Sequence, residues 1–399
     1  MGDGLLPQAR GVITPASVLL ERAVGWRQGV VSRLQPVPRT LSDVDIPGFA
    51  AVPEPFATGG TSGGAAFEPE QAKLAAIAEA LERHAAARSP LETVAEPDGA
   101  CWRLDEFSLH TPDQRARPGF RYRYADPDYT RAWTLPDNEP VWVPAGLVGL
   151  REEFGLPATS SGLAAGPSVV NALLRATQEL VERDAFTTTW LHSLAPPRLS
   201  LPDDLRTGDV RAFDLTPAYS PHPVVAVAGT LPIAGRARPT LGLACRATLA
   251  EAIRKAWLEW TQGTVFIAAQ SAPQVYRPDE VTDFDRHALY YAGHLDEWYE
   301  LPWWDGVPGP PPRSSTAHGD AAQLEELVHG LGVRLAYREL TTPEAAAVGL
   351  RCVRVLSPDL TPLHADHRWP HLGGRAADVA WRYPGRSGRF PNPAPHPLG

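Results

Sequence analysis

Residues 160–185 read SSGLAAGPSVVNALLRATQELVERDA. Small residues come first, and a helical pattern follows in which Ala172, Ala176, Glu179 and Glu182 recur at intervals of four, three and three residues. These intervals place all four side chains on one stripe of a helix, so the alanines and the carboxylates share a face. Another backbone can pack closely on an alanine face, and burying carboxylates there without partners is unfavourable. The stretch therefore predicts a helix whose glutamates need a nearby partner.

The same pattern occurs twice more along the chain. One copy reads EQAKLAAIAEALERH at residues 70–84, and the other reads EAIRKAWLEWTQ at residues 251–262. We expect helices over residues 69–88, 168–192 and 248–270. Each copy has alanines followed by acidic or amide side chains, with a cationic residue beside them. These are Ala72, Ala76, Glu79, Glu82 and Arg83 in the first copy, Arg183 after Glu182 in the second, and Ala252, Ala256, Lys255, Glu259 and Gln262 in the third.

The repeated carboxylates suggest a binding site. Glutamates three residues apart repel one another, and several converging carboxylates would bind either protons or a divalent cation. Oxygen ligands favour Mg²⁺ over zinc, and Mg²⁺ with few protein ligands usually completes its shell with water and phosphate. The sequence thus predicts a metal–nucleotide site. For any single copy, the alternative is an ordinary helix surface whose glutamates pair with Arg83, Arg183 or Lys255.

The charge and the apolar patterns of the rest of the chain exclude several classes of protein and indicate the fold class. The 399 residues carry a net charge of −9 with no long basic run, which argues against a nucleic-acid-binding protein. The N-terminus lacks a signal-peptide pattern, and no apolar run is long enough for a bilayer, so we expect a cytoplasmic protein without membrane contact. Strand-like runs at residues 224–231, 240–245 and 333–337 alternate with helices without a strict βαβ rhythm. This predicts an α+β fold with mixed sheets.

Cysteines and histidines add no second motif. The cysteines are widely spaced and odd in number, which fits reduced thiols used in packing and excludes a disulfide framework. They are Cys101, Cys245 and Cys352. The spacing of His364, His367 and His371 is reminiscent of metal ligands, but Pro370 interrupts any helix there and a fourth ligand is not obvious. We interpret these histidines as loop residues.

The chain has neither a GxxxxGK[ST] phosphate-binding loop nor a GxGxxG dinucleotide loop. In this combination the chain resembles the YcaO family, whose hallmark is a nucleotide site built from glutamates on repeated helices in place of such a loop. Similarity lies in residues 70–84, 160–185 and 251–262, in the family's order and spacing. It extends to DRHALYYAG at residues 285–293 and LGGR at residues 372–375. The resemblance implies a YcaO-like fold with Glu-bearing helices around ATP and Mg²⁺.

The final nine residues, PNPAPHPLG at 391–399, are similar to the PxPxP tail of the azoline-forming family members, the cyclodehydratases of thiazole- and oxazole-containing ribosomal peptides. The resemblance implies conversion of Cys, Ser or Thr residues in a precursor peptide to thiazoline or oxazoline rings, through phosphorylation of the backbone amide oxygen. Alternate prolines favour an extended tail that can enter a pocket with little entropy left to lose. By itself, a proline-rich terminus is more often a solvated end.

The resemblance also assigns roles by motif position. Metal and phosphate contacts fall to Glu79, Glu82, Glu179, Glu182 and Glu259. Nucleotide contacts fall to Lys255 and Gln262, with Arg83 and Arg183 holding the glutamates or phosphates. The tail would orient the substrate amide and assist proton transfer, through Pro391, Pro393, Pro395 and Gly399.

We expect an N-terminal segment over residues 1–50 and one YcaO-like domain over residues 51–399. Implied partners are the precursor peptide and a separate E1-like or ThiF-like protein that binds its leader; a flavin-dependent azoline dehydrogenase and a homodimer stay open. Two alternatives also stay open, backbone thioamide or amidine formation and a non-catalytic YcaO-like subunit that binds the precursor or an active paralogue. Departures from the family pattern motivate the second alternative. They are Ala65, Ala75, Pro167 and Asn171.

Overall fold

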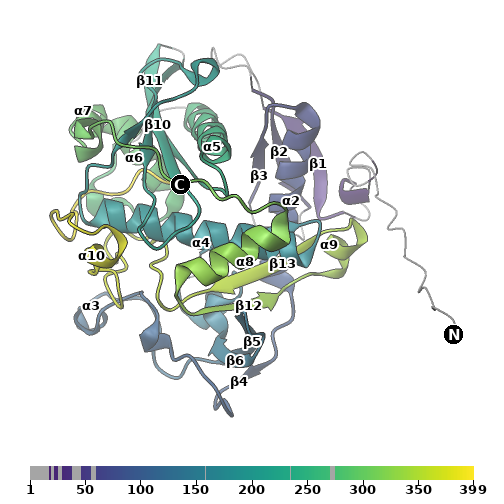
Figure 1. Ribbon diagram of the computed structural model, residues 1–399. Helices are drawn as coiled ribbons and strands as arrows, with labels where there is room; N and C mark the ends of the chain where they lie inside the picture. Colours follow the sequence, from purple (N-terminus) through teal and green to yellow (C-terminus); the bar gives the residue numbers. More distant parts are fainter. Residues whose placement is uncertain are drawn as a thin grey trace, which may run out of the picture.

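The computed structural model describes residues 18, 22–25, 29–37, 46–54, 60–157, 159–233, 235–269 and 275–399. Its named strands form three antiparallel sheets, and one long helix packs on each sheet (Figure 1). Helix α4 runs through the middle of the molecule and contacts strands of two sheets. The three long helices are α2 (Pro69–Arg88), α4 (Val169–Leu191) and α5 (Leu249–Ala269).

The first sheet has the order β1-β2-β3 and supports α2. Ala76 and Ala80 of the helix pack on Val31 and Ala51 of the sheet, because small side chains let the two backbones approach. The boundary expected at residue 50 falls inside β2, and residues 1–17 of the expected N-terminal segment lie outside the described residues. The strands are β1 (Val31–Pro36), β2 (Gly48–Pro53) and β3 (Ser62–Ala65).

The second sheet has six strands in the order β4-β5-β12-β13-β7, with β6 paired to β5. Helix α4 packs on β7 and β13, where Ala172 and Ala176 join a core that includes Val353 and Val355. Strand β7 directly precedes α4, as β3 precedes α2. The strands are β4 (Thr93–Val94), β5 (Tyr129–Leu135), β6 (Pro140–Pro144), β7 (Leu163–Gly166), β12 (Leu335–Glu339) and β13 (Arg351–Leu356).

The third sheet has the order β11-β10-β9-β8 and supports α5. Ala252 and Ala256 pack in a core with Val225 and Val227 of the long central strand. Each unit therefore consists of a strand with small residues followed by a helix with an alanine stripe. The strands are β8 (Arg198–Leu199), β9 (Arg211–Asp214), β10 (Val224–Ile233) and β11 (Arg236–Cys245).

Glycines on the strands explain the alanine stripes. A Cβ atom added to Gly64 would lie 2.3 Å from the backbone nitrogen of Ala76, and one added to Gly242 would lie 2.1 Å from the carbonyl oxygen of Ala256. Both distances are far below van der Waals contact, so only glycine allows the strand to sit this close to the helix. The close packing brings the glutamates at the end of each stripe near the strands.

The predicted elements are confirmed. The three long helices lie within one residue of their expected ends, and the predicted strands at residues 224–231, 240–245 and 333–337 overlap β10, β11 and β12. The α+β class is likewise confirmed, with helices packed on antiparallel sheets. The remaining helices are α3 (Pro112–Ala116), α6 (Phe284–Gly293), α7 (Leu295–Tyr299), α8 (Asp320–Leu331), α9 (Pro343–Ala347) and α10 (Val379–Arg382).

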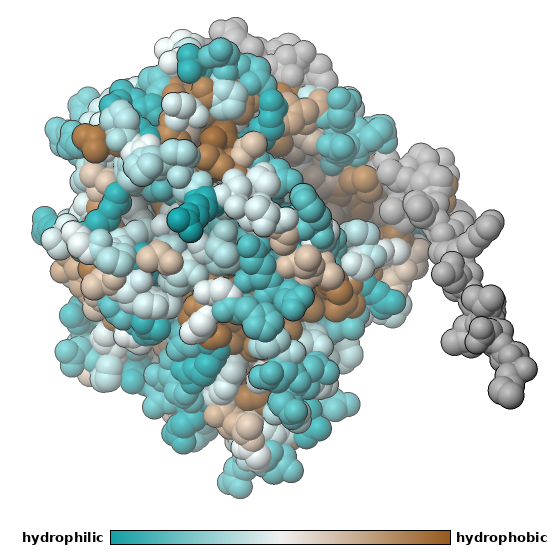
Figure 2. Space-filling model, in the orientation of Figure 1, coloured by the Kyte–Doolittle hydropathy of each residue, from teal (hydrophilic) through white to brown (hydrophobic). Residues whose placement is uncertain are grey.

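The surface is mixed in character. On the face drawn in Figure 2, hydrophobic side chains are scattered among hydrophilic ones, and the most exposed large hydrophobic residues, Val275 and Val307, lie in separate loops. Within the described ranges, we find no helix that combines the length and apolarity needed to cross a bilayer.

Candidate nucleotide and metal site

Two glutamates of α2, Glu79 and Glu82, each accept a backbone hydrogen bond. Glu79 accepts from the N–H of Gly63 on β3 at 3.1 Å and pairs with Arg83 at 2.6 Å. Glu82 accepts from the N–H of Ala165 on β7 at 3.0 Å. Because β7 belongs to the second unit, Glu82 ties the first unit to the second.

Helix α4 repeats this arrangement one unit further on. Glu182 accepts from the N–H of Cys245, at the end of β11, at 3.1 Å. Arg183 lies 3.5 Å from Glu179 and 3.5 Å from Glu182. Glu182 therefore ties the second unit to the third, as Glu82 ties the first to the second.

Helix α5 closes the arrangement. Lys255 pairs with Glu259 at 3.1 Å. The Gln262 side chain lies against β3, because a Cβ added to Gly63 would be only 2.7 Å from Gln262 Nε2. The third unit thus returns to the strand that donates to Glu79. The structure brings together all three repeated motifs that the sequence singled out.

The carboxylates lie close enough to perturb one another. Burial, together with the charges of Glu179 and Glu79, raises the pKa of Glu82 to about 8. Burial is also the main cause that raises the pKa of Glu179 to about 7; Glu182 and Glu259 contribute to this rise, and Arg183 opposes it. Glutamates from all three helices therefore share one electrostatic site.

The site has a deep side and an open side. The Glu182 side chain is only 6% exposed, whereas those of Glu79 and Glu259 are each 29% exposed. Burial also raises the pKa of the Glu182 carboxyl, and the Glu259 carboxylate contributes to this rise. A ligand could reach the carboxylates from the side of Glu79 and Glu259.

The donor set fits a hard divalent cation. Five carboxylates supply oxygen ligands of the type that Mg²⁺ prefers. The raised pKa values of Glu82, Glu179 and Glu182 mean that burial and neighbouring carboxylates disfavour their ionised forms. A bound cation would favour the ionised forms, so the residues present suit Mg²⁺ together with nucleotide phosphates. The residues able to hold it are Glu79, Glu82, Glu179, Glu182 and Glu259.

Arg354 on β13 is a site residue that the sequence analysis missed. Its guanidinium is fully buried and donates to the carbonyls of Val148, Ser161 and Thr159 at 3.0, 2.6 and 2.8 Å. Burial lowers the pKa of Arg354 to about 10, and the nearby Glu179 and Glu82 carboxylates partly oppose this. Arg354 thus adds positive charge behind the glutamates. An arginine within a strand carries no local signal of this position.

The C-terminal tail is packed against the protein and is not a solvated end. The backbone N–H of Asn392 donates to the carbonyl of Leu191, and Trp190 Nε1 donates to the carbonyl of Ala394. The Tyr291 hydroxyl donates to the carbonyl of Pro395 at 2.9 Å. Pro395 and the three residues after it are buried, and Pro391, Pro393 and Gly399 are exposed. The tail therefore lies against the C-terminal end of α4 and against α6 (Figure 1).

The tail also approaches the glutamate site electrostatically. His396 is close enough to Arg183 for that positive charge to contribute to lowering the pKa of His396, after the larger effect of burial. This links the tail with the α4 arginine that contacts Glu179 and Glu182.

Of the departures from the family pattern, Asn171 has a defined partner. Its side-chain amide donates to Asp320, at the start of α8, at 2.9 Å, and its own backbone N–H is capped by Ser168. The amide therefore fastens α8 to the first turn of α4. Pro167, Ala65 and Ala75 make no polar side-chain contact because they have no polar side-chain atom.

Comparison with known proteins gives a consistent family and fold. The family model of the YcaO cyclodehydratases, described as ATP- and Mg²⁺-binding, matches residues 63–361. A heterocyclase in complex with substrate and cofactor is similar with a TM-score of 0.71 and 18% identity, over 96% of this chain and 57% of that one. YcaO from Methanopyrus kandleri bound with AMPPCP and Mg²⁺ is similar with a TM-score of 0.63 and 20% identity, over 91% of each chain.

A third similar structure is a chain of the E. coli microcin synthetase McbBCD complex, with a TM-score of 0.59 and 15% identity, over 91% of this chain and 96% of that one. This chain spans little more than half the length of the heterocyclase. Among curated proteins, none matches the sequence.

Proposed function

This chain belongs to the YcaO family, and from that premise we propose that it is an ATP-dependent cyclodehydratase acting on a ribosomally made precursor peptide. The family is described as ATP- and Mg²⁺-binding, which agrees with the cofactors expected from the sequence. One observation carries the proposal: glutamates from three repeated helices meet at one site, and the pKa values of Glu82 and Glu179 are raised to about 8 and about 7.

The proposed reaction makes a backbone amide oxygen into a leaving group. The side-chain sulfur or oxygen of a substrate Cys, Ser or Thr attacks the preceding carbonyl carbon and loses its proton. The resulting oxyanion takes the γ-phosphoryl group of ATP, which leaves as ADP. Departure of phosphate and loss of the amide proton then form the carbon–nitrogen double bond of a thiazoline or oxazoline. The peptide loses one water in mass for each ring.

Residues of the three helices would hold the nucleotide. The carboxylates of Glu79, Glu82, Glu179, Glu182 and Glu259 would bind Mg²⁺, which supplies charge neutralisation for phosphoryl transfer when bound. Lys255 and Gln262 would contact the nucleotide, and Arg83 and Arg183 would orient glutamates or phosphates. The fixed backbone donors to Glu79, Glu82 and Glu182 hold these carboxylates in place before the ligand arrives.

The tail would position the substrate. Pro391 and Pro393 are exposed next to a docked backbone, so they could guide a peptide amide toward the site. Pro395 is buried and anchors the segment, and the exposed Gly399 would assist proton transfer. A separate E1-like or ThiF-like protein would bring the leader of the precursor peptide, and a flavin-dependent dehydrogenase could act afterwards on the azoline.

Intact mass spectrometry of the cognate precursor tests the proposal. The peptide is incubated with this protein, its partner, Mg²⁺ and ATP, and a parallel reaction contains AMPPCP instead of ATP. We expect a loss of about 18 Da per ring with one phosphate released, and no loss with AMPPCP, whose β–γ bridge resists transfer. No mass change with a verified partner and precursor would overturn the proposal.

A non-catalytic subunit is the second candidate, and the Asn171 contact favours it. Where the family often has Glu, Asn171 is occupied by its bond to Asp320, so this position of α4 offers no carboxylate ligand. Calorimetric titration with Mg²⁺ and AMPPCP separates the two candidates. Binding with partner present supports the enzyme, and undetectable binding supports the non-catalytic subunit.

A further inference from the structure

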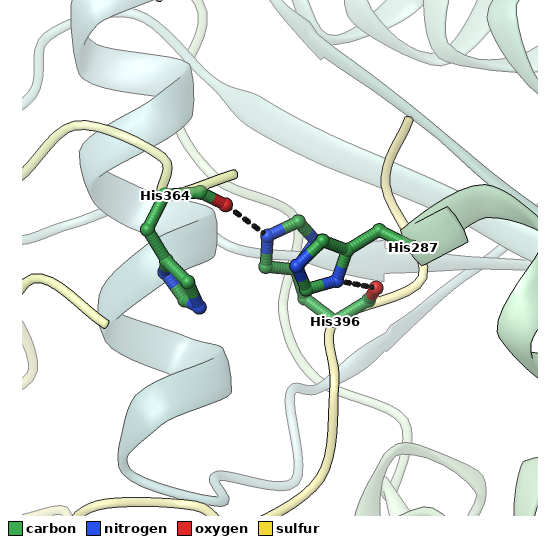
Figure 3. A group of neighbouring side chains, drawn as sticks. All are labelled: His287, His364 and His396. Carbon is green, nitrogen blue, oxygen red and sulfur yellow. Dashed lines mark hydrogen bonds between the residues drawn. The ribbon is translucent and has the colours of Figure 1, made fainter. Parts of the chain in front are cut away.

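Three buried histidines from distant parts of the chain meet beside the tail (Figure 3). His287 comes from α6, His364 from the loop after β13, and His396 from the tail itself. One nitrogen from each ring lies within 4.8 Å of the others, and the three residues are 0%, 3% and 1% exposed. His364 also lies near His367 and His371, the loop histidines with which its sequence spacing grouped it. No local spacing connects it with His287 and His396.

Backbone hydrogen bonds define which nitrogens of two rings carry a proton. His287 Nδ1 bonds the carbonyl of His396 at 2.9 Å, and His396 Nε2 bonds the carbonyl of His364 at 2.8 Å. A carbonyl only accepts, so each of these nitrogens must carry its hydrogen. In the neutral ring the other nitrogen is then a bare lone pair, at Nε2 of His287 and at Nδ1 of His396.

Those lone pairs have no hydrogen-bond partner. His287 Nε2, His396 Nδ1 and His364 Nδ1 are all buried and unpaired. Burial lowers the pKa of His287 to about 3 and lowers those of His364 and His396 as well, so the three rings are neutral. Leaving a buried polar atom unpaired is unfavourable, and these three unpaired atoms belong to neighbouring rings. An electrophile shared by the three nitrogens would offset this cost.

We propose that His287 Nε2, His396 Nδ1 and one imidazole nitrogen of His364 bind a divalent transition-metal ion of the Zn²⁺ type, with a fourth position left for water. Neutral imidazole suits zinc and similar metals, whereas Mg²⁺ prefers oxygen, so this site is chemically distinct from the glutamate site. An imidazole that donates its other N–H to a backbone carbonyl is also the usual arrangement of a metal-bound histidine.

The geometry requires a modest adjustment. With zinc–nitrogen bonds of about 2.1 Å in a tetrahedron, ligand nitrogens lie about 3.4 Å apart. The present limit of 4.8 Å therefore has to close by roughly 1.4 Å. The rings of His287 and His396 are stacked with centroids 3.6 Å apart and planes 5° apart, so their in-plane lone pairs run nearly parallel. Both rings and that of His364 would therefore have to rotate for the three nitrogens to point at one ion.

A metal here would fasten the tail at its buried part. It would join α6, the loop after β13 and the tail, beside the contacts that hold the tail to Trp190 and Leu191. This inference does not depend on the proposed cyclodehydratase activity, because it rests on the histidine geometry alone.

Cobalt binding tests the site on the full chain. The purified protein is stripped with a chelator and titrated with Co²⁺ in excess Mg²⁺, which occupies the carboxylates. Tetrahedral Co²⁺ absorbs visible light far more strongly than octahedral Co²⁺, and Zn²⁺ should displace it. We expect one equivalent to bind to the wild type, and His364→Phe to weaken binding by at least about 100-fold.

His192→Phe is the matched control. His192 is another buried imidazole; its Nε2 bonds the carbonyl of Ala376 and its ring stacks on Phe390 next to the tail, but it is not one of the three. This variant should keep one equivalent of tetrahedral Co²⁺. The wild-type titration decides the matter even if a variant fails to fold. Absence of a stoichiometric tetrahedral spectrum in the wild type, or an unchanged spectrum in folded His364→Phe, would overturn the proposal.

Discussion

Helix α4 contributes acidic side chains to two clusters, and the partners of these side chains differ. On one side, Asp184 forms two hydrogen-bonded contacts with Arg382, at 2.6 and 2.8 Å, and both side chains are fully buried. The Tyr219 hydroxyl and the N–H of Thr361 also donate to Asp184. On the other side, Glu179 and Glu182 share one arginine, Arg183, at 3.5 Å.

The two clusters have opposite electrostatic character. The Asp184 charge keeps the pKa of Arg382 raised above its usual value, although burial opposes this. The pKa values of Glu179 and Glu182 are raised, so their charged forms are disfavoured. A buried charge whose partners all lie within the chain stabilises the fold. Carboxylates without enough positive charge around them are typical of a ligand site. We therefore propose that Glu179 and Glu182 serve ligand binding and that Asp184 serves stability.

The largest expected effect is on the Asp184 side. Arg382→Met should destabilise the protein by about 3–5 kcal/mol, because it leaves the Asp184 charge buried without its partner. Guanidinium unfolding measures the loss. Arg277→Met is the control, since Arg277 pairs with Asp279 at the surface, both side chains being exposed, and should change stability far less. Similar losses in both variants would contradict the structural role of the buried pair.

On the other side of α4, Glu179→Gln should separate activity from stability. The substitution removes a disfavoured charge, so thermal stability without ligand should stay the same or rise. ATP turnover should fall on the order of 100-fold, because a metal ligand is lost. Phosphate release and thermal unfolding are measured together. Glu325→Gln, at an exposed position of α8, is the control and should leave both unchanged. Wild-type turnover in Glu179→Gln would remove this residue from the site.

The pH dependence should follow the raised pKa values. A carboxyl whose folded pKa is raised prefers its protonated form in the fold, so its contribution to stability is complete below about pH 4.5. It is lost as the pH rises through about 7 for Glu179 and about 8 for Glu82. The melting temperature of the ligand-free protein should therefore fall from about pH 6 to about pH 8.5, a range that includes both pKa values.

Ligand should reverse this trend. Mg²⁺ with AMPPCP stabilises the ionised carboxylates, so it should bind more tightly as the pH rises and release protons on binding. Calorimetry in buffers with different ionisation enthalpies counts those protons. Glu82→Gln should flatten the ligand-free melting curve above pH 7, because the group with the higher pKa is gone. A ligand-free melting temperature that rises from pH 6 to 8.5 would contradict the assigned shifts.

The sequence predicts the glutamate side of α4 well, for a physical reason. Alanines and glutamates at helical spacing define a face within one helix, and its repetition at three places predicts that the faces converge. The ends of α2, α4 and α5 follow from the same local periodicity. Periodicity does not predict which strand donates a hydrogen bond to each carboxylate, such as β7 donating the N–H of Ala165 to Glu82.

The structural side of α4 could not be predicted in this way. Asp184 and Arg382 are 198 residues apart, and Arg382 lies in a short helix with no motif around it. Arg354 and the three histidines are brought to their places by the same long-range packing. Such contacts depend on the complete topology, so a single sequence without repeats at these positions gives no local signal for them.

The smallest expected effect concerns the tail, which contacts α4 at its C-terminal end through Trp190 and Leu191. Pro391 and Pro393 are exposed, so their rings add little to the core. Replacing Pro393 with alanine should leave thermal stability within about 1 kcal/mol of wild type, while the backbone contacts of Asn392 and Ala394 remain.

The exposed prolines should matter more for the peptide than for the nucleotide. A fixed φ angle contributes about 0.4–1 kcal/mol of pre-organisation, so Pro393→Ala should slow ring formation roughly 2- to 5-fold. AMPPCP binding should be unchanged, because the glutamates belong to α2, α4 and α5. Pro311→Ala, in an exposed loop away from the tail, is the control. Equal losses in ring formation and AMPPCP binding would mean that the tail acts through the helices, which would join the two sides of α4 into one functional unit.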